Sequence, residues 1–244
     1  MTDLADREWR LLREEARPGP MQMALDEVAA ATAADGGPRT ARVYRWEPST
    51  LSLGYRQDPA TVDWAYCTCQ GIDVTRRPTG GGGIYHDAVG DISYTIAVPA
   101  EEVPGELLAC YDLLCEPILD AFERMGLDVG FADEEQPAVH QPACYLRAIH
   151  PAHDILAGGQ KISGNAQYRQ RDAVVQHGSL SYSLAVERHL GVFGADLDPA
   201  AFCDRVTSIR ERTGIDREAA VAALEGALGD WADAAEGEGT DAEL

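Results

Sequence analysis

The pattern of hydrophobic and polar positions predicts a chain that mixes helices with β-hairpins. The clearest helical signal covers residues 104–125, where apolar side chains recur at helical spacing: Leu107, Leu108, Tyr111, Leu114, Ile118 and Phe122. Residues 91–98 alternate in polarity and are rich in β-forming types, which predicts a strand. The pair Gly158-Gly159 separates two strand-like runs, 154–157 and 160–167, and predicts a hairpin.

Shorter patterns complete the predicted secondary structure. A helix is expected at 21–34, with Met23, Ala24 and Val28 on one side, and further helices are expected at 61–70, 199–209 and 216–231. Strands are expected at 41–46, 50–55, 72–75, 173–176 and 179–184. Residues 1–17 form a charged lead-in in this interpretation, and 130–153 form a loop that contains prolines. Helices and antiparallel hairpins together predict an α+β fold with a mixed β-sheet.

The length of the chain bounds its organisation. A chain of 244 residues suits one large domain, and residues 234–244 form an acidic, glycine-containing tail that we expect to be disordered. No apolar run reaches the roughly 18 residues that a membrane span requires, so no membrane partner is expected. The N-terminal residues are charged where a secretion signal would be apolar, which favours a cytoplasmic protein with reduced cysteines.

Charge narrows the possible partners. The chain has 41 acidic and 20 basic residues, a formal net charge of -21, and Lys161 is its only lysine. Such a surface repels phosphate backbones, so nucleic acid is not an expected partner. Acidic excess with lysine almost absent is the composition expected of a protein adapted to molar salt, where screening weakens self-repulsion. We therefore hypothesise a halophilic source.

The first candidate for chemistry is a glycine run, Gly80 to Gly83, within residues 76–87. Each glycine costs roughly 0.5–1 kcal/mol of folding free energy, so four in succession indicate that a bare backbone is needed. Exposed N–H groups of such a run can cradle an anion or lie against a flat ligand. Arg76 and Arg77 just upstream offer forked donors for a phosphate or carboxylate. The run matches neither a Walker A loop nor a dinucleotide-binding fingerprint.

The second candidate is the lone lysine in the predicted strand 160–167. Alternation places Lys161, Ser163 and Asn165 on one face and Ile162 on the other. Arginine would serve any surface role, so a compact ammonium is required here. That ammonium could stabilise an oxyanion, or it could hold a nearby thiol as thiolate.

The third candidate is Cys144. A thiolate beside a lysine ammonium is an activated nucleophile that can form a thioester. A zinc site is the alternative for this segment, since His140, His150 and His153 lie nearby, but their spacing matches no compact zinc motif and no metal is expected. The other cysteines, including the Cys67-Thr68-Cys69 run, are expected to be small packing residues. His177 opens a predicted strand and could equally be a core histidine with satisfied hydrogen bonds.

Five segments, taken in order, resemble the lipoate/biotin protein ligase superfamily. They are Met23–Glu27, Trp46–Tyr55, Arg76–Asp87, Lys161–Gly164 and Gln176–Ser179. The likeness covers roughly residues 8–210. It implies a catalytic domain over residues 8–233, built on a mixed, largely antiparallel β-sheet flanked by helices. It also implies an acyl pocket between the glycine run and the lysine strand.

The resemblance leaves two enzymatic activities open. In lipoate–protein ligases, ATP with Mg²⁺ converts lipoate to an acyl-adenylate, which the carrier lysine attacks. By resemblance Lys161 would hold the carbonyl and phosphate oxygens of that adenylate, with contacts from Arg77, Gly82, Gly83, Ile84 and Tyr85. Such a ligase could need a separate accessory chain. In cysteine-dependent octanoyltransferases, a cysteine takes octanoyl from acyl carrier protein as a thioester and passes it to the carrier lysine without a cofactor.

We favour the octanoyltransferase, because Cys144 lies where that cysteine is found, seventeen residues before the lysine. The ligase and a noncatalytic acyl-binding relative are the alternatives. The acceptor would be a lipoyl domain of a 2-oxoacid dehydrogenase complex or the glycine-cleavage H protein, and the donor acyl carrier protein or free lipoate. Cys144 and Lys161 are the expected catalytic residues. Expected substrate-binding residues are Arg76, Arg77, Gly81, Gly82, Gly83, Ile84, Tyr85, His86, Ser163, Gly164, Ala166, His177 and Gly178.

Overall fold

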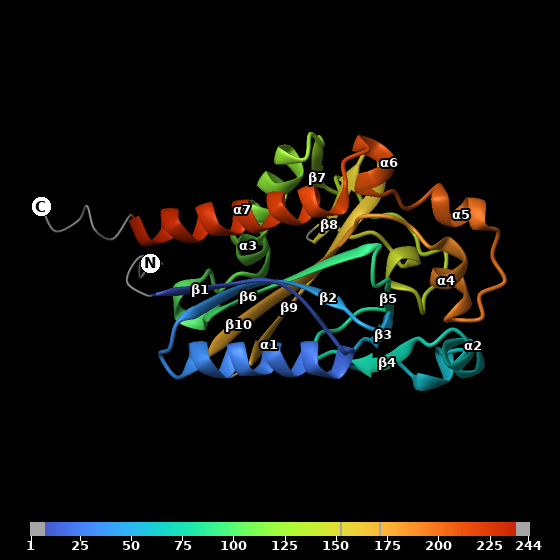
Figure 1. The fold of residues 1–244 in the computed structure, drawn as a ribbon, viewed down its shortest axis with the longest axis horizontal. Helices are drawn as coiled ribbons and strands as arrows, with labels where there is room; N and C mark the ends of the chain where they lie inside the picture. The colour runs from blue at the N-terminus through green and yellow to red at the C-terminus, as the bar shows by residue number, and fades with distance from the viewer. Residues whose placement is uncertain (1–7, 152, 171, 238–244) are drawn as a thin grey trace, which may run out of the picture.

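The computed structural model describes residues 8–151, 153–170 and 172–237, and it contains two β-sheets with helices around them (Figure 1). The larger sheet has seven strands in the order β1-β2-β6-β10-β9-β8-β7, and the smaller has three in the order β4-β3-β5. The strands of the larger sheet are, in that order, Trp9–Arg17, Arg39–Trp46, Asp91–Pro99, Ala173–Ser181, Gln160–Gln170, Asp154–Ala157 and Val129–Phe131. Those of the smaller sheet are Asp73–Arg76, Thr50–Leu53 and Ile84–His86.

The helices lie on both faces of the larger sheet, with α1 on one side and α3 and α7 on the other (Figure 1). The helices are α1 Gly19–Ala34, α2 Trp64–Cys69, α3 Leu107–Arg124, α4 Val186–Gly191, α5 Pro199–Cys203, α6 Ile209–Thr213 and α7 Arg217–Gly237. Only the β1–β2 pair of the larger sheet is parallel among the described strands, and the other pairs are antiparallel. The prediction of an α+β fold with a mixed, largely antiparallel sheet flanked by helices is confirmed.

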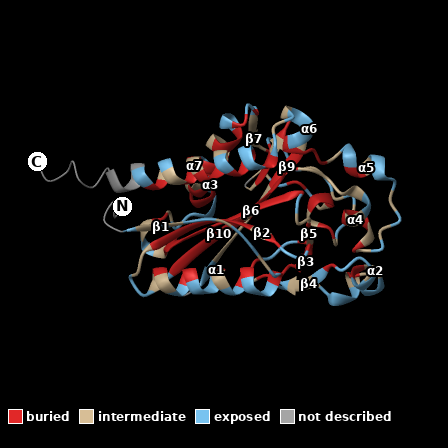
Figure 2. Cartoon of the chain, viewed as in Figure 1, coloured by how far each residue is buried: buried red, intermediate tan, exposed pale blue. Residues whose placement is uncertain are grey.

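The central strands are buried on both faces (Figure 2). On β6, Ile96 and Val98 point into the main core beneath α3 and α7, whereas Ala97 packs against the alanines of α1. Alternate side chains of a strand point to opposite faces, so this one strand supplies both cores. Among the described residues, every helix is too short or too polar to cross a membrane.

The charged lead-in expected before residue 18 is wrong for residues 9–17, which form the edge strand β1. β1 pairs in parallel with β2, and its Trp9 packs edge-on against Trp231 of α7 with ring centroids 5.1 Å apart. Charged side chains along an edge strand discourage pairing with another chain. Because charged residues interrupt apolar alternation over residues 9–17, the sequence pattern did not predict this strand.

The buried side of α1 also differs from the expected one. Val28 is 60% exposed, while Asp26 is fully buried. Asp26 is tolerated there because its Oδ1 accepts hydrogen bonds from Arg42 Nη1 at 2.9 Å and from Thr95 Oγ1 at 2.8 Å. A helix face chosen by hydrophobicity alone therefore missed the face that contacts the sheet.

Three further boundaries differ from prediction. The helix expected at 199–209 is two short helices, α5 and α6, because Ser208 accepts a hydrogen bond from Glu211 N and caps a new helix. The two strands expected at 173–184 are the single strand β10. Helix α7 continues to residue 237, into the expected tail, and residues 238–244 lie outside the described part of the chain. The hairpin of β8 and β9 is confirmed.

Arg217 joins α7 to β1 and provides a test of this packing. Its guanidinium makes two hydrogen bonds to the Glu14 carboxylate, at 2.8 and 2.6 Å, and donates to Asp91 O at 3.0 Å. Arg217→Met leaves a largely buried carboxylate without its partner, so we expect the free energy of unfolding to fall by about 2–4 kcal/mol in urea titrations. The control is Arg17→Met, which breaks an ion pair with Glu15 in which the two side chains are 43% and 59% exposed, with an expected change below about 1 kcal/mol. Equal effects of the two substitutions would contradict this account.

Candidate active site

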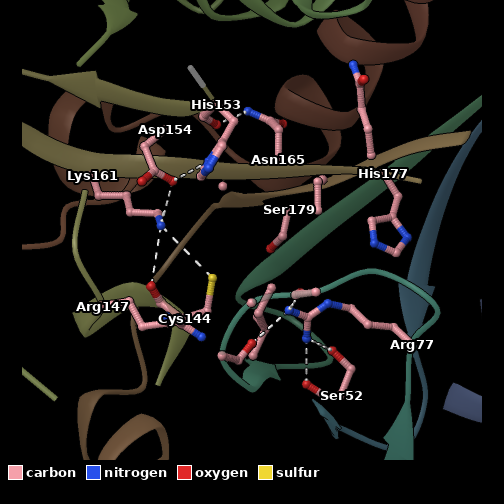
Figure 3. A pocket seen from close by; sticks show the side chains of 18 of the residues that line it. Ser52, Arg77, Cys144, Arg147, His153, Asp154, Lys161, Asn165, His177 and Ser179 are labelled. Carbon is pink, nitrogen blue, oxygen red and sulfur yellow. Dashed lines mark hydrogen bonds and ion pairs between the residues drawn. The ribbon is translucent and has the colours of Figure 1, made fainter. Parts of the chain in front are cut away.

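A cavity of about 450 Å³ opens between the glycine run, β9 and the segment that carries Cys144 (Figure 3). Most of the expected site residues line it. These are Arg77, Gly81, Gly82, Ile84, His86, Cys144, Lys161, Gly164, Ala166, His177 and Gly178. Met23, Tyr44 and Trp46 form an apolar cluster on its wall, so two of the segments that carry the family resemblance meet here.

The glycine run is held in shape by Arg77. The Nε of this buried guanidinium donates to Thr79 Oγ1, and its Nη1 donates to the carbonyl oxygen and the Oγ of Ser52. Its Nη2 donates to the carbonyl oxygens of Gly80 and Gly82. All five N–H donors of Arg77 are therefore used. Burial lowers the pKa of Arg77, and these acceptors compensate for its desolvation. The expectation that Arg77 offers a free fork to an anion is not met.

Arg76 is also engaged with backbone and does not line the cavity. Its Nη1 donates to Gly54 O at 2.6 Å and Tyr55 O at 2.9 Å, and its Nη2 donates to Gln57 O at 3.0 Å. Arg76 therefore fixes the turn after β3. A single sequence shows that two arginines are present, but it does not show which carbonyls they meet.

The glycines permit close approach of other segments. A Cβ on Gly54 would lie 2.1 Å from Gly81 O, and one on Gly82 would lie 2.8 Å from both Arg147 Cδ and Pro142 O. Gly83 is bound to the cysteine segment on both sides, because its N donates to Pro142 O and its O accepts from Cys144 N, each at 2.8 Å. The run thus forms a closely packed wall, and backbone hydrogen bonds hold the Cys144 segment against it.

A chain of hydrogen bonds runs from the wall to α1. Thr79 Oγ1 accepts from Arg77, so its hydroxyl can donate to His177 Nε2, 2.7 Å away. His177 Nδ1 then donates to Asp26 Oδ2 at 3.2 Å. His177 is therefore both a cavity residue and a histidine with both nitrogens paired. Asp26 was missed as a site residue, although it lies in the Met23–Glu27 segment.

A second chain runs through His86. Its Nδ1 is 2.9 Å from Asp91 Oδ2 and its Nε2 is 2.9 Å from Ser52 Oγ, while its ring stacks on Trp46. Burial lowers the pKa of His86 more than Asp91 raises it, so the ring is neutral at pH 7. Asp91 also accepts from Ser179 Oγ, which lies 3.3 Å from the Tyr145 hydroxyl. His86 thereby links the wall to the residue that follows Cys144.

Lys161 lies at the centre of the cavity wall and is 3% exposed. Its Nζ is 2.7 Å from Asp154 Oδ1, 3.4 Å from Cys144 O and 4.0 Å from Cys144 Sγ (Figure 3). Burial alone would lower the pKa of Lys161, but negative charge on Cys144 and Asp154 raises it above its ordinary value. Burial likewise opposes ionisation of Asp154, and Lys161 outweighs it, so the pKa of that carboxyl is low. Lys161 is therefore a buried cation beside a thiol.

The predicted face of β9 is partly wrong. Ser163 does not line the cavity, whereas Gly164 does. The pairing of β8 with β9 shifts between Ile155 and Leu156, which leaves Ile162 as an extra residue and displaces the alternation. A Cβ on Gly164 would lie 3.2 Å from Lys161 Cε, so the glycine leaves room for the lysine stem. Gly83 and Tyr85, two other expected site residues, also lie outside the lining.

The zinc alternative has no support in the described residues, which contain no group of three His, Cys, Asp or Glu side chains able to hold a metal ion. His150 and His153 stack on each other with centroids 5.1 Å apart. The six cysteines are all free thiols, and Cys144 alone among them lines the cavity.

Residues 18–229 match the lipoyl protein ligase A/B catalytic domain. The chain belongs to this family. It is 32% identical over 199 residues to the octanoyltransferase LipM of Geobacillus kaustophilus, covering 78% of this chain and 71% of that protein. To LipM of Kyrpidia tusciae it is 32% identical over 220 residues, covering 84% of this chain and 80% of that protein. The expected superfamily is confirmed.

Solved structures of family members have the same fold. A lipoate-protein ligase A bound with ATP superposes with a TM-score of 0.75 at 23% identity, covering 92% of this chain and 85% of that one. A bipartite lipoate protein ligase from Thermoplasma acidophilum, solved in a study that included its E2 lipoyl domain, gives a TM-score of 0.72 at 21% identity, covering 92% and 84%. At these identities the likeness concerns the fold.

The Lys161–Cys144 pair gives a testable expectation for thiol reactivity. Two charges 4 Å apart interact by about 4 kcal/mol at an effective dielectric of about 20, so Lys161→Met should slow alkylation of Cys144 by iodoacetamide at pH 7 at least about tenfold. Peptide mass spectrometry separates Cys144 from the other thiols. Lys161→Arg is the matched control, because it keeps a positive charge at this position and should retain more of the alkylation rate than Lys161→Met. An unchanged rate in Lys161→Met would refute the electrostatic coupling.

Proposed function

We propose that this protein is an octanoyltransferase that moves an octanoyl group from acyl carrier protein to the lysine of a lipoyl carrier domain, through a thioester on Cys144. The observation that supports it is the cavity-lining thiol 4.0 Å from a buried, charged lysine. LipM octanoyltransferases are similar to the chain over most of its length. A thiolate is the nucleophile that this pairing favours.

In the first half-reaction the Cys144 thiolate attacks the donor's thioester carbonyl. A bond forms between Sγ and the acyl carbon, the bond to the donor sulfur breaks, and the donor thiol leaves with the proton that Cys144 gave up. The Lys161 ammonium beside Sγ lies near the carbonyl under attack and can neutralise the developing oxyanion. Lys161 thus has both roles considered from the sequence.

In the second half-reaction the carrier lysine attacks the Cys144 thioester. The amide bond forms, the bond from Sγ to the acyl carbon breaks, and the amine proton returns to the cysteine thiol. The acyl tail lies against the apolar cluster of Met23, Tyr44 and Trp46, which forms part of the cavity wall. No cofactor takes part in this sequence of steps.

The ligase alternative would place ATP and lipoate in the same cavity. The ATP-bound lipoate-protein ligase A shares the fold, and Lys161 is a suitable cation for an adenylate phosphate. Mg²⁺ would have to be held mainly by the nucleotide, since the described residues offer no cluster of metal ligands. The noncatalytic alternative predicts binding of an acyl chain without turnover.

The acceptor we propose is a lipoyl domain of a 2-oxoacid dehydrogenase complex or the glycine-cleavage H protein. The Thermoplasma ligase, which shares the fold, was studied with its E2 lipoyl domain. The ligase alternative adds free lipoate as donor and a separate accessory chain. A thiol nucleophile must stay reduced, so we propose a cytoplasmic location, consistent with six free cysteines.

The decisive experiment is intact mass spectrometry of the protein mixed with octanoyl acyl carrier protein, with and without ATP. We expect an octanoyl adduct that forms without ATP, disappears in Cys144→Ala, and remains in the control Cys69→Ala, which removes an exposed thiol outside the cavity. Cys144→Ala should also abolish octanoylation of a lipoyl domain. When free lipoate replaces octanoyl acyl carrier protein as donor, ATP-dependent acylation of the lipoyl domain by Cys144→Ala would establish the ligase instead. Absence of acylation with either donor would establish the binding relative.

The acidic surface gives a separate expectation about salt. We propose adaptation to molar salt, because the net charge is -21 and lysine occurs once. Raising KCl from about 0.1 to about 1 M shortens the Debye length from about 10 to about 3 Å and weakens self-repulsion. The free energy of unfolding in urea should therefore rise across this range, whereas sucrose at equal osmolality should not reproduce the full gain. A fall in stability with KCl would contradict halophilic adaptation.

A further inference from the structure

A second cavity, of about 600 Å³, adjoins the first on the other side of the glycine wall. Both cavities are lined by Gly80, Gly81, Gly82 and Arg147, and the second is completed by residues of the turn after β3 and of the segment before Cys144. The wall between them is bare backbone. The two spaces therefore share the glycine run and Arg147, which lies three residues after Cys144.

Two arginines of this second cavity have no partner among the described residues. Neither Arg56 nor Arg147 makes a side-chain hydrogen bond or ion pair there, although acidic residues outnumber basic ones two to one. Arg56 is exposed and lines only the second cavity, whereas Arg147 is half-buried and lines both. Arg147 is thus shared with the cavity that contains Cys144, whereas Arg56 belongs to the second cavity alone.

The position of the Arg147 side chain depends on a glycine and on a second arginine. Its Cδ would be 2.8 Å from a Cβ on Gly82, so the glycine wall has room for the stem only because position 82 lacks a side chain. Its charge is close enough to Arg77 to contribute to lowering the pKa of that buried guanidinium, after burial itself. A cation held near another cation has an electrostatic cost, and the negative charge that develops on a thioester carbonyl under attack would lower it.

The chemistry of a thioester specifies what must occupy this space. A thioester carbonyl at Cys144 has two substituents, and the acyl tail fills the first cavity. The thiol arm must then leave on the other side of the carbonyl. The arm of an acyl carrier protein is a phosphopantetheine, which has a sulfur at one end, two amides along its length and a phosphate at the other end. A cavity that shares Arg147 with the space around the thiol, and that also contains the exposed Arg56, offers a donor for each end of such an arm.

We propose that the second cavity is the binding site for the phosphopantetheine arm of the acyl donor, with Arg147 at the thioester end and Arg56 at the phosphate. Exposed Tyr55 and the ring of Pro142 supply apolar surface for the middle of the arm, and the unpaired amide of Gln141 can hydrogen-bond to it. Neither Arg76 nor Arg77 serves the phosphate, because both are bound to backbone carbonyls. This assignment rests on the proposed transferase function.

The test compares donors that share the acyl group but differ in the arm. Rates of Cys144 acylation are measured by intact mass spectrometry with octanoyl acyl carrier protein, octanoyl coenzyme A and octanoyl pantetheine, which lacks phosphate. Arg56→Gln should slow acylation by the two phosphate-bearing donors about tenfold and leave the reaction with octanoyl pantetheine unchanged, since a charge-assisted hydrogen bond of about 1.5 kcal/mol is lost. Arg147→Gln should slow acylation by all three donors. Transfer from the preformed acyl-enzyme to a lipoyl domain should be unchanged in Arg56→Gln.

The matched control is Arg210→Gln, which removes an exposed arginine of α6 outside both cavities. If Arg210→Gln slows acylation as much as Arg56→Gln does, the effect comes from net charge and the proposed binding site is wrong. A loss confined to acyl carrier protein would indicate contact with the protein donor's surface, and a loss confined to the transfer step would indicate that the acceptor domain occupies the groove. Either result overturns the assignment. If the wild-type thiol is acylated by none of the donors, the proposed function fails, whereas wild-type acylation with unchanged Arg56→Gln refutes only the arm site.

Discussion

The buried ion pair of Lys161 and Asp154 is the constraint on which the site depends. An ammonium that is 3% exposed stays charged only if its desolvation is offset, and a carboxylate 2.7 Å away offsets it. Asp154 begins β8 and Lys161 lies on β9, so the pair requires the hairpin and its bulge in their observed register. The Lys161 ammonium also lies 4.0 Å from Cys144 Sγ, close enough to stabilise a thiolate there. The thiolate and Asp154 compete for one positive charge, which makes the reactivity of the thiol adjustable through either neighbour.

Sequence patterns could predict those parts of the fold in which local signals agree. The Gly158-Gly159 turn between two strand-like runs gave the hairpin, and the apolar periodicity of 104–125 gave α3. The uniqueness of Lys161 led to its prediction as a site residue, because a chain that elsewhere uses arginine indicates a requirement for an ammonium, and the structure places it in the cavity lining. The glycine run was predicted to need a bare backbone, and other backbone segments do approach Gly81 and Gly82 closely.

The remaining features depend on partners distant in sequence. Asp26 is buried because Arg42 and His177 meet it from two strands, and no pattern within α1 reveals them. Arg77 looks like an anion ligand in the sequence, but its donors are all used by Ser52 of β3, by Thr79 and by the carbonyls of Gly80 and Gly82. Ser163 was misplaced because strict alternation does not allow for an extra residue at Ile162. In each case the prediction followed the intrinsic preference of the residue type, whereas a contact with a distant part of the chain decides the structure.

The scarcity of lysine has a chemical consequence for an enzyme of this kind. Its proposed product is an amide on a lysine side chain, so any accessible amine on its own surface would be a rival acceptor for the activated acyl group. The chain carries one lysine, and that amine is buried and held protonated by Asp154, a form without nucleophilic lone pair. Arginine, which supplies the other basic side chains, remains protonated and does not compete. The near absence of lysine thus also protects the enzyme from acylating itself.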